Sequence, residues 1–518
     1  MKTASLVERY AIPLGSLPGS APAWMAEIGT QDWLRIAQAV RNEGGRLISV
    51  WGTNTSSDIQ QFIISAAYCV AEGLLWLRLP VTEQQGYPDL SGVFPAALRM
   101  QRAIFDLLGI RANGAEDVRP WLNHGKWPKD YFPLRQQFSG LEQFDSELEN
   151  YAFVSVAGDG VHEIAVGPIH AGIIEPGHFR FSVVGEKVLR LEQRLGYTHK
   201  GTEKLFAQRR MADGYRLAGR ISGDSTVAFA WAYCMAAEAA SGCQVPPRAQ
   251  WLRALLLERE RIANHLGDLG ALGNDVGLAV GLAQFSLLKE DWVRLNDQLF
   301  GHRFMMDRIV PGGTAVDLDA SGIALMLAQC EQIEIAVRTL RIIYEEHAGL
   351  QDRFINAGRV APKLAAELGL CGLAGRASAQ AWDVRADQPG IPYAQLDVRM
   401  ATHRDGDVAA RVFVRFEEIA ESLRLLREIA RQLPPGPIMT SLPEPDTDGV
   451  GIGWVEGWRG PALVALEQDA QGRILRCHCH DPSWQNWPVL QHAIMGNIVP
   501  DFPLINKSFN LSYSGHDL

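Results

Sequence analysis

The sequence predicts an α+β protein: an N-terminal α/β domain followed by a mainly α-helical domain with small β elements at both ends. The 518 residues exceed what one ordinary core needs. Within residues 1–145, short runs of β-forming residues alternate with segments of helical period. Beyond residue 187, apolar residues recur mainly at three- and four-residue spacing. We therefore assign residues 1–145 to the first domain and 146–518 to the second.

The first domain contains two predicted helices and two predicted strands. Residues 31–42 have helical spacing, and residues 94–109 do too, ending at a glycine as helix C-termini often do. Residues 46–53 and 73–81 are short apolar runs rich in β-forming residues. Residues 121–138 include several prolines, which predicts an extended connector leading to the domain boundary.

The second domain is predicted to open and close with strands and to be helical between them. Opening strands are expected at 153–156, 163–167 and 179–184, and closing strands at 462–466 and 474–480. After residue 187 the chain is expected to be mostly helical. The predicted long helices are 214–240, 247–270, 276–300, 319–346 and 411–432.

Composition excludes several classes of protein. The formal net charge of −10 argues against nucleic-acid binding and against a basic face for an anionic membrane. Seven cysteines at irregular spacing fit a reduced, cytoplasmic chain better than a disulfide framework. Prolines, glycines or amides interrupt the long uncharged stretches, so we expect neither a membrane-spanning helix nor a signal peptide. No glycine-rich dinucleotide fingerprint is found.

Several motifs resemble a known family. The hairpin Gly167-Pro-Ile-His170-Ala-Gly-Ile-Ile-Glu175-Pro-Gly-His178 resembles the opening of group 4 nickel–iron hydrogenase large subunits, and it is similar to the quinone-site 49 kDa subunit of respiratory complex I. The end of the first domain resembles the 30 kDa subunit of complex I. Further matching blocks are Leu195-Gly-Tyr-Thr-His199-Lys200, Glu260-Arg-Ile-Ala-Asn-His265, Trp382-Asp-Val-Arg385 and, in the first domain, Trp127-Pro-Lys-Asp-Tyr-Phe-Pro-Leu-Arg135.

The resemblance also marks a departure from the family, in which two Cys-x-x-Cys pairs hold nickel. Here the first pair reads Ser222-Gly-Asp-Ser225 and the second reads Ser512-Tyr-Ser-Gly515. A serine hydroxyl does not ionise near neutral pH and replaces thiolate poorly as a nickel ligand. The resemblance therefore implies that the four ligand positions are lost, that this chain holds no metal, and that it is not a functional hydrogenase.

Four further residues are the predicted catalytic groups. The resemblance aligns Glu175 with a glutamate that passes protons to the metal, and Asp275 with an aspartate of the complex I quinone site. Asp224 lies inside the first former pair, and His516 directly follows the second. We expect these side chains to converge on one wet, proton-handling cavity, because small polar replacements leave room for water. The alternative for Glu175 is an ordinary salt bridge.

Other candidate pocket residues have two interpretations each. His170 and His178 act in chemistry, or they bond backbone carbonyls exposed by the turn. Lys200 tunes a partner's cluster, or it is a surface lysine. Arg459 lies in a Trp-Arg-Gly turn where the family places active-site arginines. Arg376 and Arg385 are equally well explained as structural ion-pair formers, and the run Cys477-His478-Cys479-His480 alternates its cysteines and histidines between two strand faces, which disfavours one shared metal.

By resemblance, the chain is expected to be an oxidoreductase subunit of a membrane-associated, complex I-like energy-converting complex. It would lie peripherally on the cytoplasmic side of the membrane. Its expected partners are a small iron–sulfur subunit, ion-pumping membrane subunits and a dehydrogenase or other electron-input module. The cluster would belong to the partner, and the vacated cavity would receive a quinone or another acceptor, or would only handle protons. The alternative is a redox-silent adaptor that joins a dehydrogenase module to the membrane arm.

Overall fold

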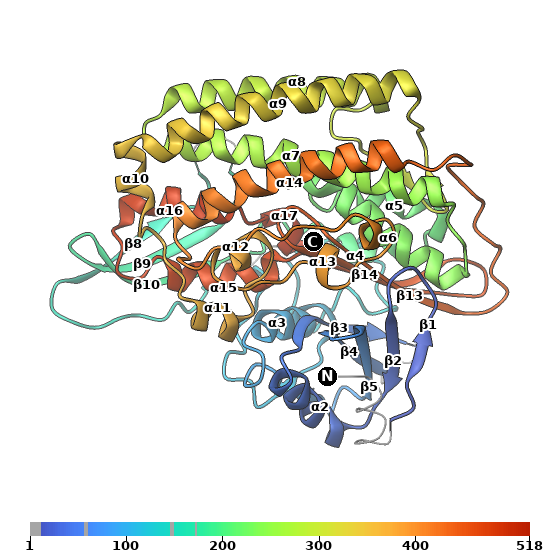
Figure 1. Ribbon diagram of the computed structural model, residues 1–518. Helices are drawn as coiled ribbons and strands as arrows, with labels where there is room; N and C mark the ends of the chain where they lie inside the picture. The colour runs from blue at the N-terminus through green and yellow to red at the C-terminus, as the bar shows by residue number, and fades with distance from the viewer. Residues whose placement is uncertain (1–11, 56–60, 146–149, 171–173) are drawn as a thin grey trace.

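The structure is a computed structural model that describes residues 12–55, 61–145, 150–170 and 174–518. A twisted sheet with two helices forms one end of the molecule, and a stack of long helices forms the other (Figure 1). The C-terminal segment lies between them, near the centre of the view. This arrangement confirms the predicted fold class.

The N-terminal domain is a five-stranded sheet in the order β1-β2-β5-β4-β3, parallel between β2 and β5 and otherwise antiparallel. One face packs against helices α2 and α3, and the other packs against the second domain through Trp51 and Trp76. The elements are β1 Gly15–Leu17, β2 Ala23–Glu27, α2 Thr30–Asn42, β3 Arg46–Asn54, β4 Phe62–Val70, β5 Gly73–Val81, β6 Tyr87–Pro88, α3 Ala97–Leu108 and β7 Ala112–Asn113.

The second domain opens with the sheet β10-β9-β8 and later forms the sheet β13-β14-β15. Long helices α7, α8, α9 and α14 pack on one another, whereas α6 packs on strands β13 and β14. The strands are β8 Val161–Val166, β9 His178–Val184, β10 Lys187–Arg194, β11 Ile309–Val310, β12 Gly313–Thr314, β13 Gly449–Glu456, β14 Pro461–Gln468 and β15 Ile474–His480. The long helices are α6 Thr226–Ser241, α7 Pro247–Asp275, α8 Ala279–Phe300, α9 Ala320–Glu346 and α14 Val408–Gln432.

Short helices connect these elements. Three of them, α15, α16 and α17, bring the C-terminus back into the interior of the molecule. The short helices are α4 Thr202–Phe206, α5 Tyr215–Ala218, α10 Ala348–Phe354, α11 Pro362–Leu368, α12 Gly372–Ala377, α13 Val384–Asp387, α15 Ser483–Ala493, α16 Phe502–Phe509 and α17 Tyr513–Asp517, with 3-10 turns at Met211–Asp213, Gly223–Ser225, Tyr393–Gln395 and Val499–Asp501.

Three predictions about elements were wrong. No strand forms at residues 153–156, and residues 187–194 form β10 rather than a helix. The expected helix at 214–240 is broken into α5 and α6 by residues 219–225. Strand β4 was missed because both of its faces are buried, which gives an uninterrupted apolar run without a period of two.

Helix α9 meets the length and composition of a membrane span, with a mean hydropathy of 1.2 over its best window, and it is the one such helix among the described residues. It packs against α8 and α14. Arg338 and Arg341 on this helix form ion pairs with Glu334 and Glu417. One helix of this kind is weak evidence of a span, since core helices of soluble proteins share these properties.

Candidate functional site

The two segments aligned with the nickel ligands meet in the interior. Ser222 precedes a 3-10 turn that leads into α6, and Ser512 caps the N-terminus of α17. Their hydroxyl oxygens lie 2.9 Å apart and share a hydrogen bond. The Ser512 hydroxyl also accepts the backbone N–H of Gly515 at 2.8 Å. Segments almost three hundred positions apart in the sequence thus come together where the family resemblance places them.

An ion pair lies beside these serines. Both terminal nitrogens of Arg459 donate to the Asp224 carboxylate, at 2.8 and 2.6 Å, and the Ser222 hydroxyl donates to it at 2.7 Å. Arg459 also donates to the Ser225 hydroxyl and to the backbone carbonyl of Asn510. The Arg459 side chain is 6% exposed, but that of Asp224 is 40% exposed, so the pair opens to solvent on the carboxylate side. Desolvation raises the pKa of Asp224, but Arg459 outweighs it and holds this pKa below its ordinary value.

A second acid, Asp481, takes the place of the fourth ligand side chain. A Cβ atom added to Gly515 would lie 2.4 Å from the Asp481 Oδ2. Asp481 is buried, and its other oxygen accepts the Ser483 N–H at 2.8 Å. Burial raises the pKa of Asp481, and Arg459 offsets part of this rise. The sequence analysis missed this residue, although it directly follows the conspicuous strand of cysteines and histidines.

These residues do not fit a nickel centre of the family type. Two of the four positions already hydrogen-bond to each other, and the position of Gly515 has no side chain and is occupied by a carboxylate. Within the described residues, no group of three or more His, Cys, Asp or Glu side chains is placed to hold a metal ion.

The cysteine–histidine strand is organised as its period of two predicts. The sulfur atoms of Cys477 and Cys479 lie 3.8 Å apart on one face. On the other face, the ring of His478 bonds Glu203 at 2.7 Å and Ser49 at 2.8 Å. The strand thereby joins the second domain to β3 of the first domain.

Glu175 and Lys200 converge on the second former ligand segment. The Glu175 carboxylate accepts the backbone N–H of Ser514 at 3.1 Å and its hydroxyl at 2.8 Å. The Lys200 ammonium donates to the same hydroxyl at 3.1 Å. Burial lowers the pKa of Lys200, and Glu175 opposes this shift. Ser514 therefore links both residues to the loop between Ser512 and Gly515, a role the sequence analysis did not give it.

Asp275 and His516 each bond a partner outside the predicted set of four catalytic residues. Asp275 forms an ion pair with Lys507 of α16 at 2.6 Å. The His516 ring bonds Asp517 at 2.7 Å and stacks on Trp484 at 4.1 Å. The Lys507 ammonium neutralises the Asp275 carboxylate, and the Trp484 indole covers the His516 ring. Among the described residues, none of the four predicted catalytic side chains hydrogen-bonds to another of the four, and their convergence on one cavity stays a prediction.

His170 and His178 bond backbone carbonyls, as one of their two interpretations holds. The His170 Nε2 lies 2.7 Å from the Gly177 oxygen, and the His178 Nδ1 lies 3.2 Å from the Gly167 oxygen. These contacts close the base of the hairpin that bears Glu175. A role for either imidazole in chemistry stays a prediction.

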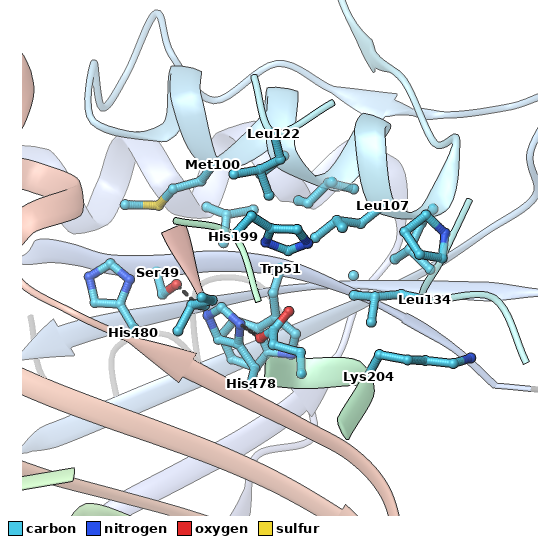
Figure 2. A pocket seen from close by; sticks show the side chains of 18 of the residues that line it. Ser49, Trp51, Met100, Leu107, Leu122, Leu134, His199, Lys204, His478 and His480 are labelled. Atoms are coloured by element: carbon cyan, nitrogen blue, oxygen red, sulfur yellow. Dashed lines mark hydrogen bonds and ion pairs between the residues drawn. The ribbon is translucent and has the colours of Figure 1, made fainter. Parts of the chain in front are cut away.

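Two cavities lie near the C-terminal segment. The first lies between the two domains and is lined by Trp51, His199 and His478 (Figure 2). Its volume is about 50 Å³, which suits water. The second is an open groove of about 760 Å³ beside Trp127 and Tyr197. This volume lies within the roughly 300–1,000 Å³ that is typical of small-molecule sites.

Two family models match the chain in succession. Residues 26–143 match the 30 Kd subunit of respiratory-chain NADH dehydrogenase, and residues 275–448 match its 49 Kd subunit. The chain is 31% identical to formate hydrogenlyase subunit 5 of Escherichia coli (strain K12), over 92% of this chain and 85% of the relative. It is also 31% identical to the carbon monoxide-induced hydrogenase of Rhodospirillum rubrum, over 67% of this chain and 97% of the relative.

A solved structure supports the same assignment. The membrane-bound sulfane sulfur reductase, an archaeal respiratory membrane complex, contains a chain with a TM-score of 0.66 and 25% identity. The match covers 70% of this chain and all of that chain. The protein therefore belongs to the family of large subunits that group 4 nickel–iron hydrogenases share with complex I. It carries 30 kDa-like and 49 kDa-like parts in one polypeptide.

Proposed function

We propose that this protein is a subunit of a membrane-associated, energy-converting oxidoreductase. It takes the place of the hydrogenase subunit that bears the nickel–iron centre, and a metal-free, proton-handling site has replaced that centre. The observation that carries the proposal is the direct hydrogen bond between Ser222 and Ser512 at former ligand positions. The partly exposed Asp224 beside it supplies a charged group in contact with solvent. A vacated site that served only as packing would favour apolar replacements, because unsatisfied buried polar groups are costly.

Glu175 is the proposed proton donor and acceptor at the edge of this site. Its carboxylate contacts Ser514, which lies between the two C-terminal ligand positions. Lys200 shares that contact and adds a positive charge nearby. A carboxylate held by a hydroxyl and an ammonium at the mouth of a buried site is suited to pass protons between the site and solvent.

The electron carriers are proposed to lie in partner subunits. An iron–sulfur subunit would dock where apolar side chains are exposed around this mouth. Tyr197 and Leu205, on either side of Lys200, are 39% and 45% exposed, and Ile174 beside Glu175 is 44% exposed. Relatives in membrane-bound respiratory complexes support ion-pumping membrane subunits as further partners. An electron-input module completes the proposed complex.

Within the part of the chain that the structure describes, a groove near these residues has a suitable size for an acceptor such as a quinone. The groove beside Trp127 and Tyr197 also contacts His178 and His199 and presents Arg180. Aromatic and cationic side chains of this kind suit a ring that gains electron density on reduction. We propose that the acceptor binds there rather than in the cavity of about 50 Å³ between the domains.

Elemental analysis of the purified native complex tests the loss of the metal. We expect nickel well below one atom per copy of this chain, because the donor set lacks thiolates. About one nickel per chain would overturn the proposal.

Measuring turnover of the assembled complex then distinguishes the proposed function from that of a redox-silent adaptor. Glu175→Gln is expected to lower coupled turnover about 100-fold or more, which is the low end of general acid–base contributions. Glu186→Gln is the matched control, since it removes the same charge from the exposed end of the same sheet. Assembly should be intact in both variants. Equal turnover of the two would leave the adaptor function standing.

A further inference from the structure

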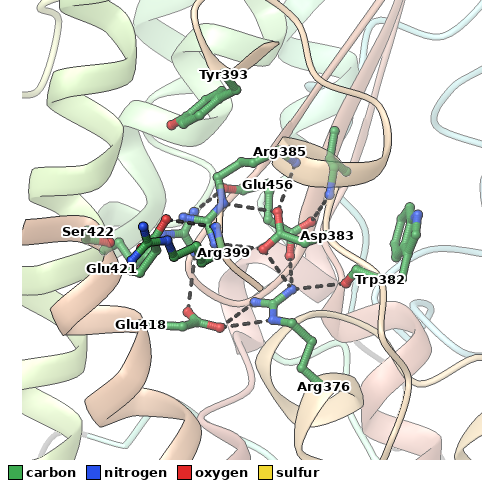
Figure 3. A network of polar contacts seen from close by, with 12 residues as sticks. Arg376, Trp382, Asp383, Arg385, Tyr393, Arg399, Glu418, Glu421, Ser422 and Glu456 are labelled. Atoms are coloured by element: carbon green, nitrogen blue, oxygen red, sulfur yellow. Dashed lines mark hydrogen bonds and ion pairs between the residues drawn. The ribbon is translucent and has the colours of Figure 1, made fainter. Parts of the chain in front are cut away.

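A separate group of charges is buried beneath the former metal site. It joins helices α7, α12, α13 and α14 to the end of β13, and each member is at most 4% exposed (Figure 3). Its residues are Arg261, Arg376, Arg385, Glu258, Asp383, Glu418, Glu456 and His265. We call this set the arginine–carboxylate cluster.

Most of the carboxylates in the cluster contact several donors. Glu418 bonds Arg376 at 2.7 Å and His265 at 2.8 Å. Asp383 accepts two nitrogens of Arg385, at 3.0 and 2.7 Å. Glu258 pairs with Arg385 at 3.1 Å and with Arg261 at 3.2 Å, and hydroxyls of Tyr393 and Ser422 also donate to it.

Glu456 has fewer donors than these three carboxylates. Among the described residues, one guanidinium nitrogen of Arg376 donates to it at 2.7 Å and the backbone N–H of Val384 donates at 3.2 Å. That guanidinium nitrogen also lies 3.4 Å from Asp383, so two carboxylates compete for it. The Cys371 thiol is a further titratable neighbour of Glu456.

Most charged groups around the cluster are paired among themselves, but Glu260 of α7, a neighbour of Arg261, accepts the backbone N–H groups of Val227 and Ala228, and burial raises its pKa to about 8. Arg415 binds Asp268, Arg253 binds Glu238, and Arg424 binds Glu421. At the outer edge, the Asp387 carboxylate accepts the backbone N–H of Asp383, and Arg46 lies over the ring of Trp382.

The cluster contains one negative charge too many. Three guanidinium groups face four carboxylates, and arginine remains protonated in proteins. An uncompensated charge in a dry interior is strongly unfavourable, and a buried group accepts a proton instead of bearing that cost. One member of the cluster therefore takes up a proton when the protein folds.

His265 is a poor acceptor for this proton. Its Nε2 bonds Glu418, and its buried Nδ1 has no hydrogen-bond partner among the described residues. A proton added at Nδ1 would thus have no acceptor. Burial also lowers the pKa of His265, although Glu418 opposes this shift.

We infer that Glu456 holds the extra proton and that the arginine–carboxylate cluster is a one-proton binding site. Burial and the neighbouring Asp383 raise the pKa of Glu456 to about 7, although Arg376 and Arg261 oppose this rise. The site therefore exchanges its proton near neutral pH. Its members differ from those of the vacated metal centre, so the inference does not depend on the function proposed for that centre.

The backbone connects this proton site to the former metal site. Arg261 donates to the carbonyl groups of Glu456 and Gly457. The next residue, Trp458, donates its indole N–H to the Asp224 carbonyl at 2.8 Å, and Arg459 follows it. A change of charge on Glu456 thus occurs three residues from the guanidinium that pairs with Asp224.

Infrared spectroscopy of the full chain tests the inference directly. The carbonyl band of a protonated, buried carboxyl group should be present at about pH 6 and reduced at about pH 8, since the pKa of Glu456 is about 7. Glu456→Gln should remove the part of this band that titrates near pH 7 and leave the part that titrates near pH 8, which belongs to Glu260. Glu421→Gln, which changes an acid of the neighbouring α14 that is paired with Arg424, should keep both parts.

Stability measurements give an independent readout. The pKa of Glu456 rises from an ordinary 4.5 to about 7 on folding, so the unfolding free energy should fall as pH rises between these values. Glu456→Gln, which resembles the protonated acid, should flatten that fall and leave stability near pH 5 unchanged. The inference is overturned if the wild-type chain shows no carboxyl band that titrates near pH 7, or if that part of the band is unchanged in Glu456→Gln.

Discussion

The two segments that align with the nickel-ligand pairs of the family, here called the two halves of the site, obtain their polar groups in different ways. The half that precedes α6 has two serines with an aspartate between them, and that aspartate binds Arg459. The half at the C-terminus has one serine and a glycine, and Asp481, directly after β15, occupies the space in front of that glycine. The first half supplies its own polar groups, whereas the second half receives one from elsewhere in the fold.

This difference shows that the space at a ligand position without a side chain can be filled by a residue from outside the motif. A glycine at a ligand position leaves a hole, and a buried carboxylate filling it needs compensation. Arg459 supplies this compensation, because it contacts Asp224 directly and lowers the pKa of Asp481 against the effect of burial. The guanidinium therefore serves both halves of the site.

Replacing Arg459 should have the largest effect. Arg459→Met leaves Asp224 and Asp481 without their shared positive charge. Breaking a buried ion pair costs roughly 3–5 kcal/mol, and the partial exposure of Asp224 favours the lower end. Denaturant-induced unfolding measures the change. Arg353→Met, which breaks a surface pair with Asp501, should cost less than about 1 kcal/mol. Similar losses in both variants would show that the guanidinium does not join the halves.

Adding a methyl group at Gly515 should show the difference between the two halves most clearly. Gly515→Ala places its Cβ against the Asp481 carboxylate, and overpacking of this kind costs about 1–3 kcal/mol. The control lies at Gly223 in the first half, where an added Cβ meets nothing within 4 Å. Gly223→Ala should change stability by less than about 0.5 kcal/mol. Adding Asp481→Ala to Gly515→Ala should recover stability relative to Asp481→Ala alone, and an additive double variant would contradict the proposed contact.

The serine pair should contribute a smaller amount. Ser222→Ala removes hydrogen bonds to Asp224 and Ser512, for an expected loss of about 1 kcal/mol. Ser225→Ala removes one longer bond of 3.3 Å from Arg459 and should cost less. Thermal unfolding ranks the two variants. The reverse order would mean that the halves are not joined through Ser222.

The pH dependence of stability gives the smallest expected effect. The pKa of Asp481 in the folded chain is raised above its ordinary value of 3.8, so the folded state binds this proton more tightly than the unfolded state. Its contribution is complete below pH 3.8 and is lost as pH rises through the raised pKa. Asp481→Asn should flatten that decline. The exposed Asp405→Asn should leave the profile unchanged, and equal profiles in all three proteins would argue for an ionised Asp481.

Helices and strands whose apolar residues recur with a clear period were predicted from the sequence, and elements without such a period were missed. Helices α7, α8, α9 and α14 were foreseen from apolar spacing, and the meeting of Ser222 with Ser512 followed from family motifs. The partner of Asp275 was not foreseen, because Lys507 lies 232 positions away on a helix that was not predicted. Arg376 and Arg385 were recognised as possible ion-pair formers, but the excess carboxylate is visible only when all their neighbours are counted in space.

The joint between the two domains has a consequence for assembly. Trp51 and Trp76 of the first sheet pack with Trp382 and Trp454 of the second domain, and Ser49 bonds His478 across the boundary. In this chain, residues matching two separate respiratory subunits are covalently connected. Tethering replaces a bimolecular encounter with an intramolecular one, for which effective concentrations reach the millimolar range. The stoichiometry of the two parts is thereby fixed at one to one during synthesis, whatever the abundance of the remaining subunits.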